Sequence, residues 1–244
     1  MTVVDVPPHE CSDPAPVGRR ACGAECSAPS RDLIETTELR WFESGALPAS
    51  LRSWFTRDCA HGRLEERTDL YRIDGRVDVG VKVRGRSTLE IKSRQSSIAL
   101  ERSPIERGGV AHGGVLEVWW KGRPEDAGLD GRTGAWVEVS KTILKRRFSI
   151  AGDELTVSES DDPPDRAFCD VEIVAIDVGA SASWSLALAA QGPPSARGAS
   201  IAMAWRSLAS VPPPGEWLSL SAMSCGYPEW LERRIDCDDS MIAR

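Results

Sequence analysis

Apolar and polar residues alternate with unusual regularity in the stretch VGVKVRGRSTLEIKSR, residues 79–94. Val79, Val81 and Val83 fall on one face of an extended chain, and charged residues fall on the other once the chain turns at Gly85. The pattern predicts a β-hairpin with one charged face. Such a face could simply be solvated, because antiparallel sheets commonly bury only one face, or it could line a site for a polyanion.

The same alternation recurs along the chain and predicts further strands. It is found in the stretches IETTELRWF, LEERTDLYRI, GVLEVWWKG, AWVEVSK, ILKRRFSI, FCDVEIVAIDV and SWSLALAAQG. AWVEVSK and ILKRRFSI are consistent with one interrupted strand or two shorter ones, and the last two stretches predict a hairpin around the turn GAS. Helical spacing of apolar residues predicts helices in LPASLRSWF, over residues 199–208 and in YPEWLERR.

The number and kind of these elements indicate the fold class. Roughly eight short strands with glycine turns, and only two or three short helices, predict a mainly β (α+β) protein built on an eight-stranded antiparallel β-barrel or tunnel. We expect this domain to span residues 32–235. Residues 1–31, rich in Pro, Ser, Ala and Cys, predict a disordered or loosely attached N-terminal extension, and residues 236–244 predict a flexible acidic tail.

Composition limits the class of protein further. The 244 residues contain no run of about 18 apolar residues and no apolar signal core, so we expect a cytoplasmic protein without a membrane partner. A formal net charge of -7 argues against binding to duplex nucleic acid. Seven cysteines, an odd number, argue against a disulfide framework. Nothing in the sequence indicates an oligomeric state.

Several predicted strands carry pairs of charged residues two positions apart. These pairs are Glu38 with Arg40, Lys82 with Arg84, Glu90 with Lys92, and Asp170 with Glu172. A barrel interior normally excludes such residues, because burying a charge is costly unless it is paired or bound to an ion. If the charged faces point inward, the cations can hold phosphate oxygens and the carboxylates a divalent metal. If they point outward, the same residues are surface ion pairs or solvated carboxylates.

A series of motifs resembles the CYTH or triphosphate tunnel metalloenzyme superfamily: ETTELRW, RTDLYR, VGVKVRG with LEIKSR, CDVEIV and SLALAAQG, in this order. The resemblance covers the chain from Leu33 to Leu208. It implies an antiparallel tunnel that binds a triphosphate-containing small molecule or nucleotide together with Mg or Mn. The family includes triphosphatases, thiamine triphosphatases and class IV adenylyl cyclases, and the motifs do not separate a hydrolase from a cyclase.

The resemblance assigns roles to four residues of the first and a late strand. The family's opening Glu-x-Glu-x-Lys signature corresponds to Thr36, Glu38 and Arg40, so a threonine replaces one carboxylate. The resemblance implies that Glu38 is catalytic, orienting water, and binds metal, and that Arg40 binds substrate. Asp170 and Glu172 correspond to the family's late carboxylate pair and are the other implied metal ligands.

The other implied substrate-binding residues are basic and suit phosphate oxygens. They are Lys82, Arg84 and Lys92 from the hairpin, and Lys141 and Arg147 from the middle strands. The match in the middle strands is loose. Lys145 and Arg146 are alternatives there, because the sequence does not show which of these side chains point inward.

Two functions of different class follow from this pattern. The first is a divalent-metal-dependent hydrolase of a triphosphate-containing small molecule or nucleotide. The second is a noncatalytic module that binds a phosphorylated small molecule or a protein partner, and Thr36 favours it because a carboxylate is lost there. A third, a barrel that carries an apolar ligand, would require an apolar interior.

Overall fold

The computed structural model of the chain describes residues 33–57, 63–85, 87–101, 106–107, 110–111, 113–124, 135–151, 154–158, 167–211 and 223–236. Contacts divide the chain into two units, Met1–Ser30 and Arg31–Arg244, and every described element belongs to the second. The predicted N-terminal extension lies outside the described residues. The predicted acidic tail does too, apart from Asp236, which ends the last helix.

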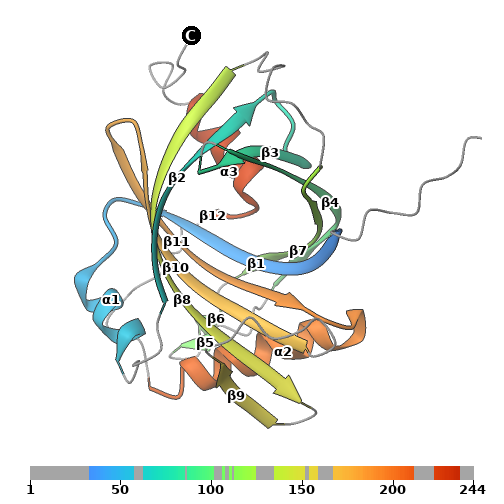
Figure 1. Cartoon of the computed structure of the whole chain (residues 1–244). Coiled ribbons are helices and arrows are strands. Elements are labelled where there is room, and N and C mark those ends of the chain that lie inside the picture. Colours follow the sequence, from blue (N-terminus) through green and yellow to red (C-terminus); the bar gives the residue numbers. More distant parts are fainter. Residues whose placement is uncertain are drawn as a thin grey trace, which may run out of the picture. The chain divides into compact units, whose positions relative to one another are not determined.

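Eight antiparallel strands close into a barrel (Figure 1). They are β1 (Ile34–Ser44), β2 (Arg63–Ile73), β3 (Val79–Arg84), β4 (Thr88–Leu100), β7 (Gly114–Gly122), β8 (Ala135–Ala151), β10 (Ala167–Val178) and β11 (Ser181–Gln191). Around the barrel the order is β10, β11, β1, β7, β4, β3, β2 and β8, and β8 pairs with β10 to close the ring. The alternating stretches of the sequence therefore predicted the fold class correctly.

Four short strands complete the sheets. β9 (Glu154–Ser158) pairs with β8, and β12 (Met223–Ser224) pairs with β1. β5 (Glu106–Arg107) and β6 (Val110–Ala111) pair with each other in a separate sheet. The segment predicted as one interrupted or two shorter strands is the single strand β8, because β2, β10 and β9 together supply backbone partners along its length.

Two helices cover part of the outer face of the barrel. α1 (Ala49–Thr56) buries Leu51, Trp54 and Phe55, whose spacing matches one face of a helix. α2 (Pro194–Leu208) packs in the same apolar cluster as outward-facing residues of β10 and β11. It begins earlier than predicted, because proline is well suited to the first turn of a helix. No helix in the described part of the chain is long and apolar enough to span a membrane.

The third helix, α3 (Tyr227–Asp236), packs against the inner face of the barrel at one end (Figure 1). The ring of Phe42 stacks on Trp230 with centroids 4.5 Å apart, and the ring of Tyr71 stacks on Tyr227 at 5.6 Å. We call these four rings the aromatic plug. The sequence predicted a helix here but not its place inside the barrel.

Candidate functional site

The inner face of the barrel is charged. Alternation along the strands places a set of basic side chains there, which we call the basic wall: Arg40, Arg67, Lys82, Arg84, Lys92, Arg94, Lys121, Lys141, Lys145 and Arg147. The same inner faces carry fewer carboxylates: Glu38, Glu65, Asp69, Glu90, Glu117, Asp170 and Glu172. Basic residues are therefore in excess among the described interior side chains, although the whole chain has a formal net charge of -7.

Ion pairs between strands that are not neighbours show that these side chains point inward. Arg40 on β1 lies 3.7 Å from Glu172 on β10, although β11 separates the two strands. Lys92 on β4 lies 3.8 Å from Glu38 on β1, although β7 separates them. Neighbouring strands are about 4.8 Å apart, so such contacts form on the concave side of the sheet. The structure places every site residue predicted from the sequence on this inner face.

Glu38 lies near the middle of β1 and is 4% exposed. The Thr36 hydroxyl donates a hydrogen bond of 3.1 Å to Glu38 Oε1, and Lys121 forms an ion pair with the same carboxylate. Burial alone would raise the pKa of Glu38, but the charges of Lys121, Lys92 and Arg40 outweigh burial and hold this pKa well below its usual range. Glu38 is therefore an ionised carboxylate surrounded by cations.

Lys92 faces Glu38 across the interior. Its ammonium lies 4.0 Å from the centre of the Trp119 ring, a cation–π contact. Burial, reinforced by the charges of Lys121 and Arg40, lowers the pKa of Lys92 to about 8, and the opposing effect of Glu38 offsets only part of this shift. An anion bound beside Lys92 would favour the charged form of the amine.

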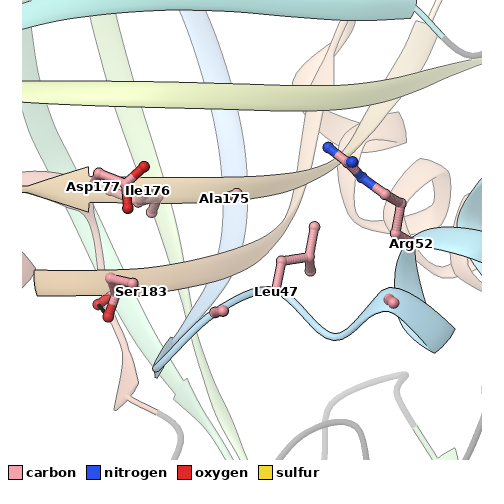
Figure 2. Close-up of a pocket in the computed structure, with 9 residues that line it drawn as sticks. Leu47, Arg52, Ala175, Ile176, Asp177 and Ser183 are labelled. Carbon is pink, nitrogen blue, oxygen red and sulfur yellow. Dashed lines mark hydrogen bonds between the residues drawn. The ribbon is translucent and has the colours of Figure 1, made fainter.

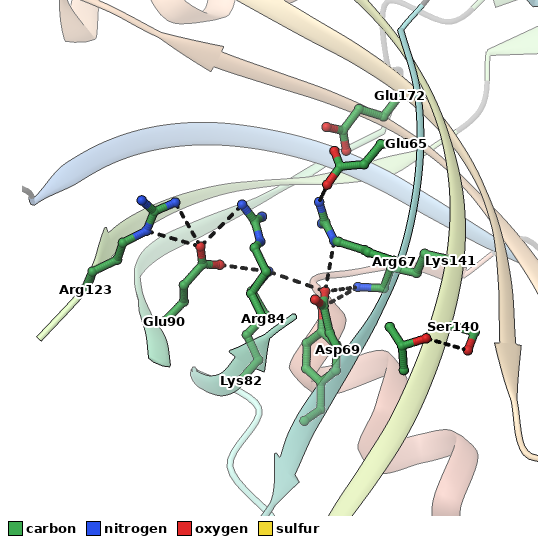
Figure 3. Close-up of polar contacts among 12 residues, drawn as sticks. Glu65, Arg67, Asp69, Lys82, Arg84, Glu90, Arg123, Ser140, Lys141 and Glu172 are labelled. Carbon is green, nitrogen blue, oxygen red and sulfur yellow. Dashed lines mark hydrogen bonds and ion pairs between the residues drawn. The ribbon is translucent and has the colours of Figure 1, made fainter. Parts of the chain in front are cut away.

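A second cluster is centred on Asp69, a fully buried residue of β2 (Figure 3). Its Oδ2 accepts hydrogen bonds from Lys141 Nζ at 3.2 Å and from Arg67 Nε at 3.2 Å, and Lys82 Nζ lies 3.7 Å away. Burial would raise the pKa of Asp69, but these cations hold it below its usual value. Asp69 Oδ1 has no hydrogen-bond partner among the described residues. Asp69 thus fixes three members of the basic wall and leaves one acceptor atom unused.

Glu90 on β4 connects Lys82 and Arg84 of the basic wall with Arg123 (Figure 3). Its carboxylate lies 2.9 Å from Lys82 Nζ, 3.4 Å from Arg84 Nη1 and 3.2 Å from Arg123 Nη2. Lys82 therefore bridges Glu90 and Asp69. Lys82 and Arg84, two of the hairpin cations predicted from the sequence, therefore belong to one connected network, whereas the third, Lys92, pairs with Glu38.

The structure shows which basic residues of β8 point inward. Arg147 binds Asp170 with two nitrogens, Nε at 2.7 Å and Nη2 at 2.9 Å, and Lys145 Nζ lies 3.0 Å from the same carboxylate. Lys141 points inward as well, toward the Asp69 cluster. Arg146 points to the outer face, between two inward neighbours, as alternation requires. Lys141, Lys145 and Arg147 therefore share the inner face of β8.

The three predicted metal ligands line the same interior but do not form a cluster. Glu38 lies on β1, and Asp170 and Glu172 lie on β10, with β11 between these strands. Each carboxylate faces a basic side chain. Within the described residues, no group of three or more His, Cys, Asp or Glu is placed to hold a metal ion. The expected Mg or Mn site stays a prediction, and the observed pairing does not fit it.

The interior also contains charged residues that the sequence did not single out as site residues. Arg67 pairs with Asp69, Arg94 with Glu117, and Lys121 with Glu38. The signal that could have found them is the alternation in RTDLYR, LEIKSR and EVWWK, where each of these side chains shares a face with an inward neighbour.

A cleft of about 330 Å³ lies on the outer side of the barrel, between the start of α1 and the β10–β11 hairpin (Figure 2). Leu47 and Arg52 line it on one side, and Ala175, Asp177 and Ser183 line it on the other. None of the site residues predicted from the sequence lines this cleft. The charged interior, and not this cleft, is therefore the candidate site.

The sequence matches no protein-family model and no curated protein. Function is therefore inferred from the charges and geometry of the barrel interior.

Proposed function

We propose that the barrel interior binds a triphosphate-containing small molecule or nucleotide, as the resemblance to the triphosphate tunnel superfamily implies. The observation that carries this proposal is the basic wall. Every barrel strand except β10 and β11 contributes a cation to it. Because these cations surround one interior, they can contact several phosphate groups of one ligand at once, and arginine can contact two oxygens of one phosphate.

Charge balance supports a polyanion over an apolar ligand. Buried charges are costly unless they are paired, and the described interior holds more cations than carboxylates. The lowered pKa of Lys92 reflects burial and the neighbouring cations. A polyanion would supply the missing negative charge, whereas an apolar ligand would leave the cations without additional partners.

Binding without catalysis is the form of this function that the geometry supports best. Glu38, Asp170 and Glu172 each face a basic side chain and are not gathered around one point. Thr36 stands where the family carries a further carboxylate, and its hydroxyl serves as a hydrogen-bond donor to Glu38. The side chains are thus arranged to hold an anion rather than a metal.

A metal-dependent hydrolase is the second candidate, and the position of Glu38 favours it. This carboxylate is buried and ionised beside Lys92 and Lys121, two cations suited to phosphate. A carboxylate in that place can orient a water toward a bound phosphate. The hydrolase would also require Mg or Mn, whose role would be to neutralise charge on the phosphates.

Titration calorimetry of the full chain with tripolyphosphate, ATP and thiamine triphosphate tests the binding proposal. We expect binding in the presence of EDTA. Lys82→Gln should weaken tripolyphosphate binding by about tenfold, the effect of losing one charge-assisted hydrogen bond. Arg72→Gln is the control, because Arg72 lies on the other face of the same β2–β3 hairpin and pairs with Asp74. Folded protein that binds none of the three ligands would overturn the proposal.

Phosphate release from the same ligands, with Mg or Mn, tests the second candidate. Metal-dependent release that is lost in Glu38→Gln, while tripolyphosphate binding persists, would establish the hydrolase. If the wild type releases no phosphate from ligands that it binds, the protein is a binding module.

A further inference from the structure

One end of the barrel is closed by the aromatic plug. Tyr227 and Trp230 of α3 are buried among residues on the inner faces of β1, β2, β8 and β10. Phe42 meets Tyr227 edge to face at 5.1 Å, in addition to its stacking on Trp230. Aromatic pairs in such geometries attract each other, and this attraction adds to the free energy gained by burying the rings. The plug is therefore part of the packed core at this end.

Polar contacts and close packing fasten α3 in this position. Glu229 accepts a hydrogen bond of 3.1 Å from Arg94 Nη1 on β4. Glu232 accepts from the backbone N–H groups of Asp74 and Gly75, at 3.1 and 2.9 Å, in the turn between β2 and β3. The helix is thus held by β4 and by the turn between β2 and β3, so the closed end is a fixed feature of the fold.

Two cations of the basic wall lie directly against the aromatic plug. The Arg40 guanidinium lies 4.9 Å from the centre of the Tyr227 ring. The Lys141 ammonium lies 4.2 Å from the same ring and 4.5 Å from the ring of Tyr71. The side chains of Arg40 and Lys141 are only 9% and 3% exposed. They mark the deep end of the charged interior.

Exposure of the basic side chains rises toward the opposite end. Lys121, which pairs with the first residue of β1, has a side chain that is 38% exposed. Arg84, at the end of β3 away from α3, is 37% exposed, and Arg123 just beyond β7 is 60% exposed. We call this the outer end. An anion therefore meets Arg84, Lys121 and Arg123 first and Arg40 and Lys141 last.

We propose that the interior is a one-ended pocket that takes a polyphosphate chain end first, with the free terminal phosphate at Arg40 and Lys141. An organic group at the other end of the polyphosphate then stays at the outer end of the pocket. A polyphosphate esterified at both ends is excluded, because its leading organic group would meet the aromatic plug and keep phosphate oxygens from reaching the two deep cations. This inference rests on the proposed binding of triphosphates and adds the orientation and class of the ligand.

Calorimetry with three ligands in EDTA tests the inference. Tripolyphosphate and ATP each have a free terminal phosphate, and diadenosine tetraphosphate has none but carries a charge similar to that of ATP. We expect diadenosine tetraphosphate to bind at least about a hundredfold more weakly than ATP, since it loses charge-assisted hydrogen bonds to two buried cations. Similar affinities for these two nucleotides, or binding of tripolyphosphate alone, would overturn the inference while leaving anion binding intact. No binding by any of the three would overturn the proposed function itself.

A pair of variants locates the terminal phosphate independently. Lys141→Gln, at the deep end, should weaken the binding of ATP by about tenfold and leave the residual affinity for diadenosine tetraphosphate unchanged. Arg123→Gln, at the outer end, should weaken the binding of both ligands by a similar factor. Circular dichroism establishes that each variant is folded. An equal loss for both ligands in Lys141→Gln would contradict the end-first orientation.

Discussion

Asp69 shows how a single carboxylate organises the basic wall. It lies on β2 and binds Arg67 of its own strand, Lys82 of β3 and Lys141 of β8. These three cations would repel one another without it, because all of them are directed at the same point. Asp69 is thus a positioning residue, which prepares the cations for a bound anion.

Asp69→Asn should therefore lower the free energy of unfolding by about 3 kcal/mol, the order found when one partner of a buried ion pair is removed. Urea unfolding at pH 7 measures the change. The control is Asp78→Asn, since Asp78 is exposed and its pairing with Arg76 is a surface ion pair. That control should change stability by less than about 0.5 kcal/mol. Equal effects of the two substitutions would show that Asp69 does not hold the cluster together.

At the scale of the elements, much of the barrel could be predicted from the sequence. Side chains alternate strictly along a strand, so one inward residue fixes the direction of the others. Glu38 and Arg40 share a face for this reason, as do Lys82 and Arg84. The sequence also predicted most strands and all three helices, because period-two and helical spacing are local signals.

Two features of the site could not be predicted, because they depend on contacts between distant segments. The Asp69 cluster requires the register of β2 against β3 and β8, which no single stretch encodes. The place of α3 is also non-local: YPEWLERR shows an amphipathic helix, but not which surface covers its apolar side. For β8 the sequence did not show which side chains point inward. The structure shows that Lys141, Lys145 and Arg147 share the inner face.

The fit of α3 against β3 can be tested at Gly80. A Cβ added there would lie 2.9 Å from Pro228 Cγ and 3.2 Å from Lys92 Cγ, so the helix or the lysine would have to shift. Gly80→Ala should lower the free energy of unfolding by about 1–3 kcal/mol, as overpacking does. Thermal unfolding followed by circular dichroism measures the loss.

Gly198→Ala is the matched control for this substitution, with the opposite expected sign. Gly198 lies in α2, where an added Cβ would meet nothing within 4 Å. Alanine should therefore stabilise the protein by about 0.5–1 kcal/mol, because it has the higher helix propensity. A Gly80→Ala protein as stable as the wild type would show that α3 does not pack tightly against β3.

At the scale of the whole molecule, positive charge is concentrated inside a chain that is acidic overall. The pKa values of Lys82, Lys92 and Lys141 are all lowered, in each case mainly by burial and with a contribution from neighbouring cations. The charged form of each of these lysines is thus less favourable in the folded state than in water. A bound polyanion would favour the charged form, so stability and ligand binding are linked through the same residues.

This linkage gives a pH dependence of stability with a defined sign. Lys92 titrates near 10.5 in the unfolded chain, and its pKa in the folded protein is about 8. Between these pH values Lys92 binds more protons in the unfolded state than in the folded state. The titration of Lys92 therefore makes the free energy of unfolding rise with pH. Relative to Lys92→Gln, the free energy of unfolding of the wild type should increase by about 3 kcal/mol in total as the pH is raised from 7 to 10.5.

Urea unfolding of the two proteins across this range measures the gain, and groups common to both, such as the buried tyrosines, cancel in the difference. If the difference in the free energy of unfolding between the two proteins stays constant with pH, the lowered pKa of Lys92 is contradicted. Saturating tripolyphosphate should reduce the gain, because an anion beside Lys92 raises its pKa in the folded state and so removes the difference from the unfolded chain. A gain that persists with the ligand bound would place the phosphates away from Lys92, even if calorimetry shows binding.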